Sequence, residues 1–231
     1  MPHWLYTLLL RLSLPLVLGV LAIRGWREPQ RRMDLPARLG WRLPPDTRAP
    51  LWLHGASVGE VQAAAGLIRL LRQTHPALPL LLTSGTATGQ ARARLLYGDL
   101  LLPNESGQAP LGLRQAPFDL PGAVRRFLAA TRPCGVVLLE TELWPNLIAG
   151  VARSGVPLAM VSARVSERST QRYQRWARRL IGATLARIKW IGAQTREDAQ
   201  RFGRLGARDV DVSGNLKFDF PLPPDIDARG A

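Results

Sequence analysis

Short apolar runs alternate with amphipathic stretches between residues 51 and 213. The runs have the length of strands, and in the stretches between them apolar residues recur every three or four positions, which is typical of helices. Such alternation predicts an α/β fold, a Rossmann-like parallel sheet with helices on both faces. Strands are expected at 51–54, 78–83, 135–139, 157–162, 190–193 and 210–213, and helices at 60–73, from 89 through 96, at 144–154, at 172–187 and from 195 onward.

The N-terminal apolar run, residues 4–23, is about long enough to cross a bilayer core of ~30 Å. Arg11 and Pro15 interrupt it, and a charge at the bilayer centre costs about 2.5–3.5 kcal/mol. No small-residue cleavage site of a signal peptide follows. Arginines follow instead, at 24, 27, 31 and 32, and they would hold the rest of the chain on the cytoplasmic side. We expect an uncleaved anchor that either spans the membrane or lies in its interface; a buried helix of a soluble core is the alternative.

The pattern divides the chain into four parts. We expect a membrane anchor at 1–26, a Pro-rich connector at 27–50, one Rossmann-like domain at 51–214, and the start of a linker at 215–231. The Pro/Gly-rich segment 101–115 is expected to be an exposed irregular loop.

Composition adds a strong positive charge. There are 31 Lys+Arg against 17 Asp+Glu, a net charge of +14, and Lys189 and Lys217 are the only lysines. The excess reflects either a GC-rich genome or an anionic partner such as phosphate groups or a membrane surface, because the arginine fork binds phosphate well. Nucleic acid is not expected, since no basic stretch is interleaved with stacking aromatics. The single cysteine, Cys134, excludes an internal disulfide and is expected to be packed at the start of a strand.

Candidate chemistry lies where strands end, because ligands of doubly wound sheets bind at the carboxyl ends of strands. The segment HGASVGE, residues 54–60, runs from a strand through small residues to a carboxylate that opens a helix. Glu60 is either a helix-start acid stabilised by the helix dipole or a general base that faces a cleft. The segment 83–89, TSGTATG, either caps a helix or binds an anion or sugar hydroxyls. In ETELWPN, residues 140–146, two carboxylates and a Trp between strand and helix are hard to explain as packing.

These segments, in this order and spacing, resemble the signatures of the Kdo transferases, glycosyltransferase family 30, which add an acidic eight-carbon sugar to a lipid A precursor. The resemblance extends from about residue 20 to the end. Further matching segments are FDLP at 118–121, SARVSERS at 162–169, AQTREDAQRF at 193–202 and SGNLKFD at 213–219.

The resemblance implies an N-terminal domain of a GT-B glycosyltransferase, preceded by a membrane-associated helix. It implies inverting transfer of Kdo from CMP-Kdo to lipid IVA at the cytoplasmic face of the inner membrane, in lipopolysaccharide biosynthesis, without a cofactor or a required metal. By position Glu60 would be the base and Glu140 a second functional carboxylate. The substrate-binding residues would be Ser57, Gly59, Thr83, Ser84, Thr86, Thr88, Gly89, Glu142, Trp144, Arg164 and Arg168.

Arginines recur every three or four residues from 164 to 179 and would form one stripe on a helix that begins early enough. Two interpretations stay open, a contact with lipid phosphates or membrane, and an ordinary solvated face. The arginines of this stripe are Arg164, Arg168, Arg172, Arg175 and Arg179.

Two features depart from the family pattern. Segment 101–115 lengthens the approach to FDLP, and the chain stops soon after SGNLKFD although family members are nearly twice as long. We therefore expect the acceptor-binding half, inactive alone, with the CMP-Kdo-binding half absent, as a fragment, a truncated product or one part of a split enzyme. A different class of function remains open, a non-catalytic membrane-surface protein that binds anionic lipid through its arginine excess.

Overall fold

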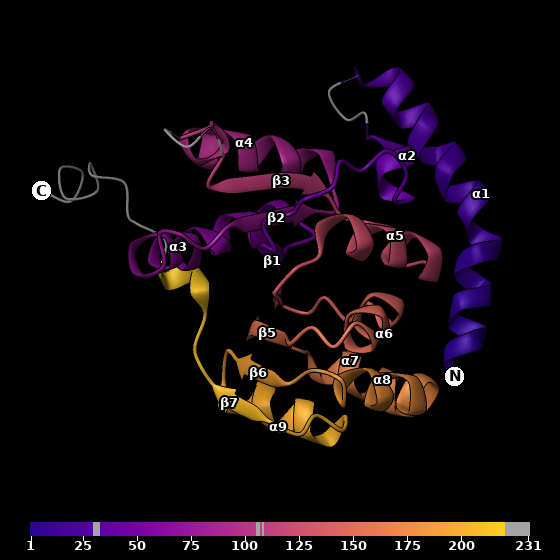
Figure 1. The fold of residues 1–231 in the computed structure, drawn as a ribbon. Helices are drawn as coiled ribbons and strands as arrows, with labels where there is room; N and C mark the ends of the chain where they lie inside the picture. The colour runs from indigo at the N-terminus through magenta and orange to yellow at the C-terminus, as the bar shows by residue number, and fades with distance from the viewer. Residues whose placement is uncertain (30–32, 105–106, 108, 220–231) are drawn as a thin grey trace, which may run out of the picture.

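The computed structural model describes residues 1–29, 33–104, 107 and 109–219, and within them the chain forms a seven-stranded parallel sheet (Figure 1). The strand order is β3-β2-β1-β4-β5-β6-β7, so the order reverses at β1. This confirms the predicted Rossmann-like parallel sheet. The strands are β1 (Leu51–His54), β2 (Leu80–Ser84), β3 (Leu111–Gln115), β4 (Gly135–Leu139), β5 (Leu158–Ala163), β6 (Trp190–Ala193) and β7 (Val210–Val212).

Helices cover both faces of the sheet, as the sequence predicts. Helices α3 and α4 share one apolar core with the sheet, and α5, α6, α8 and α9 share the other. The two groups lie on opposite faces because right-handed crossovers change face where the strand order reverses. The helical segments are α1 (His3–Arg27), α2 (Leu35–Arg38), α3 (Val58–Thr74), α4 (Ala87–Leu101), α5 (Pro121–Thr131), α6 (Pro145–Arg153), α7 (Glu167–Arg172), the π-helical η2 (Tyr173–Ala177), α8 (Arg178–Leu185), α9 (Arg196–Arg204) and the 3-10 helical η3 (Leu216–Asp219).

The two cores follow from the alternation of side chains along each strand. In β1, Trp52 faces the α5 side, where its ring packs 4.7 Å from that of Phe127, and Leu53 faces the α3 side. Trp52, Leu53 and Phe127 are fully buried. Burial of a side chain of this size stabilises the fold by about 1.5–3 kcal/mol, so the sheet forms a rigid base for the loops at its carboxyl edge.

Three predictions of local structure are wrong. The expected loop 101–115 contains the edge strand β3. Its composition does not favour a strand, and pairing with β2 stabilises it instead. The helix expected at 172–187 is divided into the end of α7, the π-helical η2 and α8, with a break at Ala177. Cys134 is exposed rather than packed, because it precedes β4 at the amino edge of the sheet.

Helix α1 lies along the outside of the domain, beside α2 at its end and with its first residues near α8 (Figure 1). None of its residues is buried, which argues against a helix of a soluble core. Its outward side chains are apolar and open, with Leu12 69% and Leu16 72% exposed. It is the one helix among the described residues that is long and apolar enough to cross a membrane. One periodic face is partly covered by the domain, at His3, Thr7, Leu10, Leu14, Leu18, Leu21 and Gly25.

After β7 the chain returns to the opposite side of the sheet. There η3 lies beside α3 (Figure 1), and Leu216 packs against the core that α3 and α4 share. This return brings Lys217 to the carboxyl edge of the sheet, where it pairs with Glu140.

Candidate functional site

The segments singled out in the sequence meet at one edge of the sheet. The strands β2, β1 and β4 are direct neighbours, and the three segments 54–60, 83–89 and 140–146 follow their carboxyl ends. Three carboxylates gather there, Glu60, Glu140 and Glu142, and we call them the carboxylate cluster. The negative charges of Glu60 and Glu140 both raise the pKa of Glu142, which shows that the three are electrostatically coupled.

Glu60 forms the capping box of α3. Its Oε2 accepts from the backbone N–H groups of Ala56 at 2.5 Å and Ser57 at 3.2 Å, and the Ser57 hydroxyl accepts from the Glu60 N–H at 3.3 Å. Ser57 and Gly59 are exposed at the mouth of this turn, whereas Glu60 is buried. The helix-start interpretation of Glu60 is therefore present in the structure. Because both backbone bonds go to Oε2, Oε1 is the oxygen that remains for a ligand.

The 83–89 segment divides into buried and open positions. Thr83 and Ser84 are fully buried, and Ser84 donates to the Ala56 carbonyl at 3.3 Å. Thr86 caps α4 by accepting from the Gly89 N–H at 3.0 Å, so the capping interpretation is present here too. Gly89 is buried against Ser84 and Thr86, where a Cβ atom would meet the Ser84 hydroxyl. The exposed hydroxyls of Thr86 and Thr88 are thus the groups of this segment that a ligand reaches.

Glu140 follows β4 in a strained conformation, with φ of +56° although it is not glycine. Strain of this kind persists only where the surroundings fix it. One carboxylate oxygen of Glu140 lies 3.2 Å from Arg164 Nε, and the other lies 2.7 Å from Lys217 Nζ. Ser162, at the end of neighbouring β5, has a φ of +53° and accepts from the backbone N–H of Leu216 at 3.3 Å. The two strained positions together hold η3 against the site.

Glu142 is the most perturbed carboxylate of the cluster. Burial, together with the charges of Glu60 and Glu140, raises its pKa to about 7, and the Trp144 side chain opposes this shift. Carboxyl groups with strongly perturbed pKa values cluster at functional sites. Trp144 lies at the entrance of α6 and packs edge-on against His54, with ring centroids 4.8 Å apart.

His54 lies at this edge of the sheet, although it was not among the predicted site residues. It is fully buried at the end of β1, its Nδ1 lies 2.9 Å from Thr83 Oγ1, and its Nε2 lies 3.9 Å from Glu142 Oε2. Trp52 Nε1 donates to the same Thr83 hydroxyl at 2.8 Å. The available signal was the alternation of side chains, which places Trp52 and His54 on one face of β1.

Asp119 is a second residue that the sequence did not select. It belongs to the FDLP segment and accepts from the backbone N–H groups of Asn146 at 3.2 Å and Leu147 at 2.6 Å, so that its carboxylate caps the first turn of α6. Tyr6 of α1 donates to Asp119 at 2.7 Å, and Thr7 donates to Asn146 Oδ1 at 2.9 Å. The N-terminal helix is thereby hydrogen-bonded to the turn that follows Glu142.

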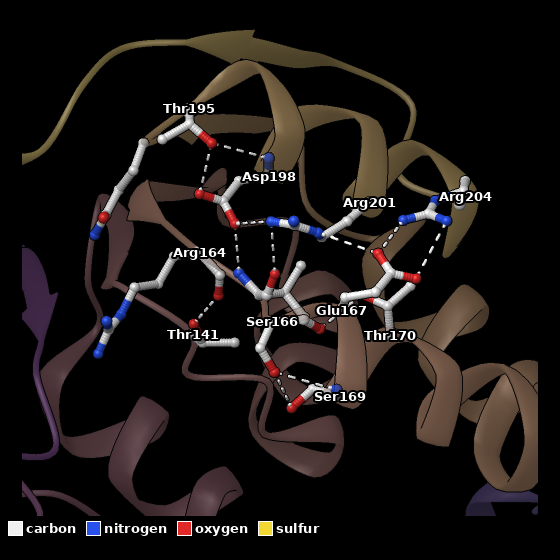
Figure 2. Close-up of polar contacts among 12 residues, drawn as sticks. Thr141, Arg164, Ser166, Glu167, Ser169, Thr170, Thr195, Asp198, Arg201 and Arg204 are labelled. Carbon is white, nitrogen blue, oxygen red and sulfur yellow. Dashed lines mark hydrogen bonds and ion pairs between the residues drawn. The ribbon is translucent and has the colours of Figure 1, made fainter.

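The loop after β5 carries a separate polar cluster (Figure 2). Asp198 accepts from the Val165 N–H at 3.0 Å and from the Thr195 hydroxyl at 3.0 Å, and Arg201 pairs with both Asp198 and Glu167. These contacts fold the segments SARVSERS and AQTREDAQRF onto each other, and the Thr195 side chain caps α9 by accepting from the Asp198 N–H.

The predicted arginine stripe is not continuous. Arg164 precedes the Ser166 cap of α7, so it lies outside the helix. In Figure 2 its side chain points away from Asp198 and Arg201, and it pairs with Glu140. Arg168 is exposed on α7, and the π-helical turn of η2 shifts the register of the arginines that follow. A polar cavity of 560 Å³ lies beside Arg164 and is lined by Thr141, Ser166, Ser169, Tyr173 and Gln194 among others.

Solved structures show a related fold. The chain matches the UDP-GlcNAc 2-epimerase of Methanocaldococcus jannaschii with a TM-score of 0.50 and 16% identity, over 74% of this chain and 48% of that one. It matches a putative UDP-N-acetylglucosamine 2-epimerase of Listeria monocytogenes with a TM-score of 0.50 and 13% identity, over 74% of this chain and 46% of that one. At this identity the likeness concerns the fold alone.

Proteins related in sequence identify the family of the chain. The chain is 40% identical to a 3-deoxy-D-manno-octulosonic acid transferase of Bordetella pertussis, over 96% of this chain and 51% of that protein. It is 32% identical to the Haemophilus influenzae protein of the same name, over 94% of this chain and 49% of that protein. The chain thus spans about half the length of these relatives. A family model described as 3-deoxy-D-manno-octulosonic-acid transferase (kdotransferase) matches residues 33–220. The chain therefore belongs to the 3-deoxy-D-manno-octulosonic acid (Kdo) transferase family.

Proposed function

We propose that this chain is the acceptor-binding, base-bearing half of an enzyme that transfers Kdo from CMP-Kdo to lipid IVA in lipopolysaccharide biosynthesis. The observation that carries the proposal is the carboxylate cluster at the carboxyl edge of the sheet, in a chain that belongs to this family. A hydroxyl nucleophile needs a base within reach, and the cluster supplies carboxylates at the edge of the sheet where ligands of such folds bind.

In the proposed reaction the acceptor hydroxyl attacks the anomeric carbon of Kdo, with inversion. Oε1 of Glu60 takes the hydroxyl proton, the new C–O bond forms, and CMP leaves with the electron pair of the broken bond on its phosphate. Glu142 has a pKa of about 7 and is therefore partly protonated near neutral pH, which reduces the negative charge beside Glu60. No cofactor or metal takes part in these steps, because the phosphate leaves as an anion that positive groups of the complete enzyme stabilise.

The other site residues bind and position the acceptor. Ser57, Gly59, Thr86 and Thr88 are exposed in the turns that follow β1 and β2 and contact the acceptor, whereas the buried Thr83, Ser84 and Gly89 shape the turn beneath them. Trp144 lies beside His54 at the wall of the site. Glu140 fixes Arg164 at the rim, and Arg164 and Arg168 provide cations for the phosphates of lipid IVA.

The exposed apolar face of α1 supports a location at a membrane, and we propose the cytoplasmic face of the inner membrane, where lipid IVA would be met. The chain spans about half the length of its curated relatives, and we assign binding of the donor CMP-Kdo to the other half of the enzyme.

The test is transfer of Kdo from CMP-Kdo to lipid IVA by this chain completed with the C-terminal half of a family member. Glu60→Gln separates the two roles of Glu60, since glutamine also forms capping boxes but is not a base. We expect transfer to fall by about 10²-fold or more, with unchanged thermal unfolding. The matched control is Glu197→Gln, which changes a first-turn acid of α9 far from the cluster. Full activity of the Glu60→Gln enzyme would remove Glu60 from the proposed role.

Vesicle flotation of the chain alone tests the competing function. Binding that requires the phosphorylated sugar headgroup of lipid IVA supports the acceptor-binding proposal. Equal binding to any anionic vesicle, together with no transfer by the completed enzyme, would favour a non-catalytic membrane-surface protein that uses its arginine excess.

A further inference from the structure

His54 presents its two ring nitrogens to different partners. Nδ1 lies 2.9 Å from Thr83 Oγ1, and Nε2 lies 3.9 Å from Glu142 Oε2, slightly beyond hydrogen-bond distance. Within the described residues Nε2 is a buried nitrogen without a hydrogen-bond partner, and the side chain is fully buried. A buried polar atom that is left unpaired in this way requires an explanation, and the group it faces is a carboxylate of the cluster.

The hydrogen bonds of Thr83 fix the tautomer of His54. The indole N–H of Trp52 is only a donor, so Thr83 Oγ1 accepts from it at 2.8 Å. The single hydroxyl proton of Thr83 then goes to the remaining neighbour, His54 Nδ1, which must accept it. In the opposite tautomer both Trp52 Nε1 and His54 Nδ1 would donate to Thr83 Oγ1. Neither ring nitrogen could then accept the hydroxyl proton of Thr83, which is buried. A neutral imidazole that accepts at Nδ1 carries its proton on Nε2.

We propose that His54 is a positioning residue, held by Thr83 as the Nε2–H tautomer, which donates from Nε2 to the carboxylate of Glu142 and so holds Glu142 beside Glu60. A small rotation of Glu142 shortens the 3.9 Å separation to a hydrogen bond. The catalytic consequence rests on the proposed function of the carboxylate cluster; the tautomer and the contact with Glu142 do not.

The surrounding charges favour this arrangement. Burial, together with the charge of Arg38 from α2, lowers the pKa of His54 to about 3, so the ring is neutral at physiological pH. Glu142 faces Glu60 from α3 and Glu140 from the end of β4, and both raise its pKa. The cations Arg164 and Lys217 are engaged by Glu140. A neutral N–H donor at His54 therefore lowers the proton affinity of Glu142, which its neighbours raise.

The tautomer is measured directly by ¹⁵N NMR of the full chain in detergent. The chain has three histidines, so the loss of one signal in His54→Gln assigns His54. We expect a protonated Nε2 and an unprotonated Nδ1 at neutral pH. Thr83→Val removes the hydroxyl that fixes the tautomer, whereas Thr83→Ser keeps it, so the signal pattern should change only in the valine variant. A protonated Nδ1 in the unmodified chain would overturn the proposal.

A pair of His54 variants separates the two contacts. Asparagine places its amide near the position of Nδ1 and keeps the Thr83 contact, whereas glutamine reaches the position of Nε2 and keeps a donor toward Glu142. In ¹³C-glutamate-labelled chain, with the signal assigned by Glu142→Gln, we expect His54→Asn to raise the proton affinity of Glu142 about tenfold and His54→Gln to leave it within about threefold. Equal titration of Glu142 in the asparagine variant and the unmodified chain, both folded by circular dichroism, would show that His54 does not donate to it.

The completed enzyme separates failure of this inference from failure of the proposed function. If Kdo transfer is present, His54→Asn should move the pH–rate profile toward higher pH while His54→Gln leaves it in place, a change that a merely structural role would not produce. If no transfer is found but the NMR results are as expected, the proposed function fails and the His54–Glu142 contact stands. Transfer with a pH–rate profile that neither variant moves would overturn the positioning role alone.

Discussion

At the scale of single residues, the two oxygens of Glu60 divide an observed structural contact from the proposed catalytic one. Oε2 accepts both backbone hydrogen bonds of the capping box, which stabilises the first turn of α3. The same bonds fix the direction of Oε1, so a structural contact also orients the proposed base. Because a carboxylate held by one oxygen keeps little rotational freedom, binding of the acceptor does not have to order it.

Glu142 gives a prediction for stability. Its pKa is raised from 4.5 in the unfolded chain to about 7 in the fold, so the unfolded state ionises first as the pH rises. The free energy of unfolding therefore falls progressively as the pH rises from about 4.5 to 7, relative to a chain with a neutral group at this position. We expect Glu142→Gln to stabilise the chain at pH 8 by on the order of 2–3 kcal/mol and to have little effect at pH 4, as measured by urea unfolding.

The control for this prediction is Glu197→Gln. Hydrogen bonds with its own backbone and with Thr195 lower the pKa of Glu197, so its removal should act in the opposite direction and weakly, because the side chain is solvent-exposed. A Glu142→Gln variant that is no more stable than the unmodified chain at pH 8 would show that the cluster does not disfavour ionisation of Glu142.

Only part of this residue-scale description could be predicted from the sequence. The segment HGASVGE suggested both tasks of Glu60, because a capping box is a local pattern that a short window contains. The relation of His54 to Thr83 and Glu142 was not predictable, since it requires β2, β1 and β4 to be neighbours. Strand order is a property of the whole sheet, and no single window contains it.

At the scale of elements, Asp119 connects α1 to α6. One carboxylate caps the first turn of α6 and accepts the hydroxyl of Tyr6, and burial raises the pKa of this carboxyl. Since α6 begins directly after Glu142 and Trp144, the position of the N-terminal helix is linked to the wall of the proposed site through one side chain.

Removal of one hydroxyl tests this connection. Tyr6→Phe keeps the ring but removes the hydrogen bond to Asp119, and we expect it to cost roughly 1–2 kcal/mol, because the bond goes to a partly buried carboxyl group. Urea unfolding measures the cost, and hydrogen exchange of the amides in the first half of α1 should become faster. Tyr173→Phe, on η2, is the control and should change neither. Unchanged exchange in Tyr6→Phe would mean that α1 is held by its apolar contacts alone.

Elements with strong patterns were predictable, and elements defined by their neighbours were not. β4 was placed at its observed bounds because its apolar run is continuous. β3 was missed because Leu111–Gln115 has no β-branched residue and depends on pairing with β2. The break in the helix after α7 was missed because π-helical turns are rare and mostly occur as single turns inside otherwise α-helical segments.

At the scale of the whole molecule, α1 decides how the chain meets a membrane. Its covered face recurs every three or four residues from His3 to Gly25, so the domain flanks the helix along nearly its full length. At 1.5 Å per residue this is roughly 30 Å or more, the thickness of a bilayer core. If α1 spanned the membrane in this position, the polar domain would be drawn into the hydrocarbon, where burial of its charged surface side chains is very costly. We therefore expect α1 to lie in the interface with its outward apolar face inserted.

Quenching of fluorescent labels by lipid-bound quenchers tests this orientation. In a Cys134→Ser background, single labelled cysteines at residues 4, 12, 16 and 23 sample the exposed face of α1. An interfacial helix places all four at a similar shallow depth, about 5–10 Å below the headgroups, whereas a spanning helix changes depth by about 1.5 Å per residue. We expect the four labels to lie at a uniform depth.

Substitution of the inserted side chains tests the same orientation by vesicle binding. We expect the double variant Leu12→Asp with Leu16→Asp to bind vesicles at least tenfold more weakly, because two inserted side chains of this size contribute about 1.5–3 kcal/mol each. Leu14→Asp and Leu18→Asp, on the covered face, are the matched control: they should loosen α1 from the domain while leaving its outward apolar face intact. A depth that increases steadily from residue 4 to residue 16 would show instead that α1 leaves the domain and spans the bilayer.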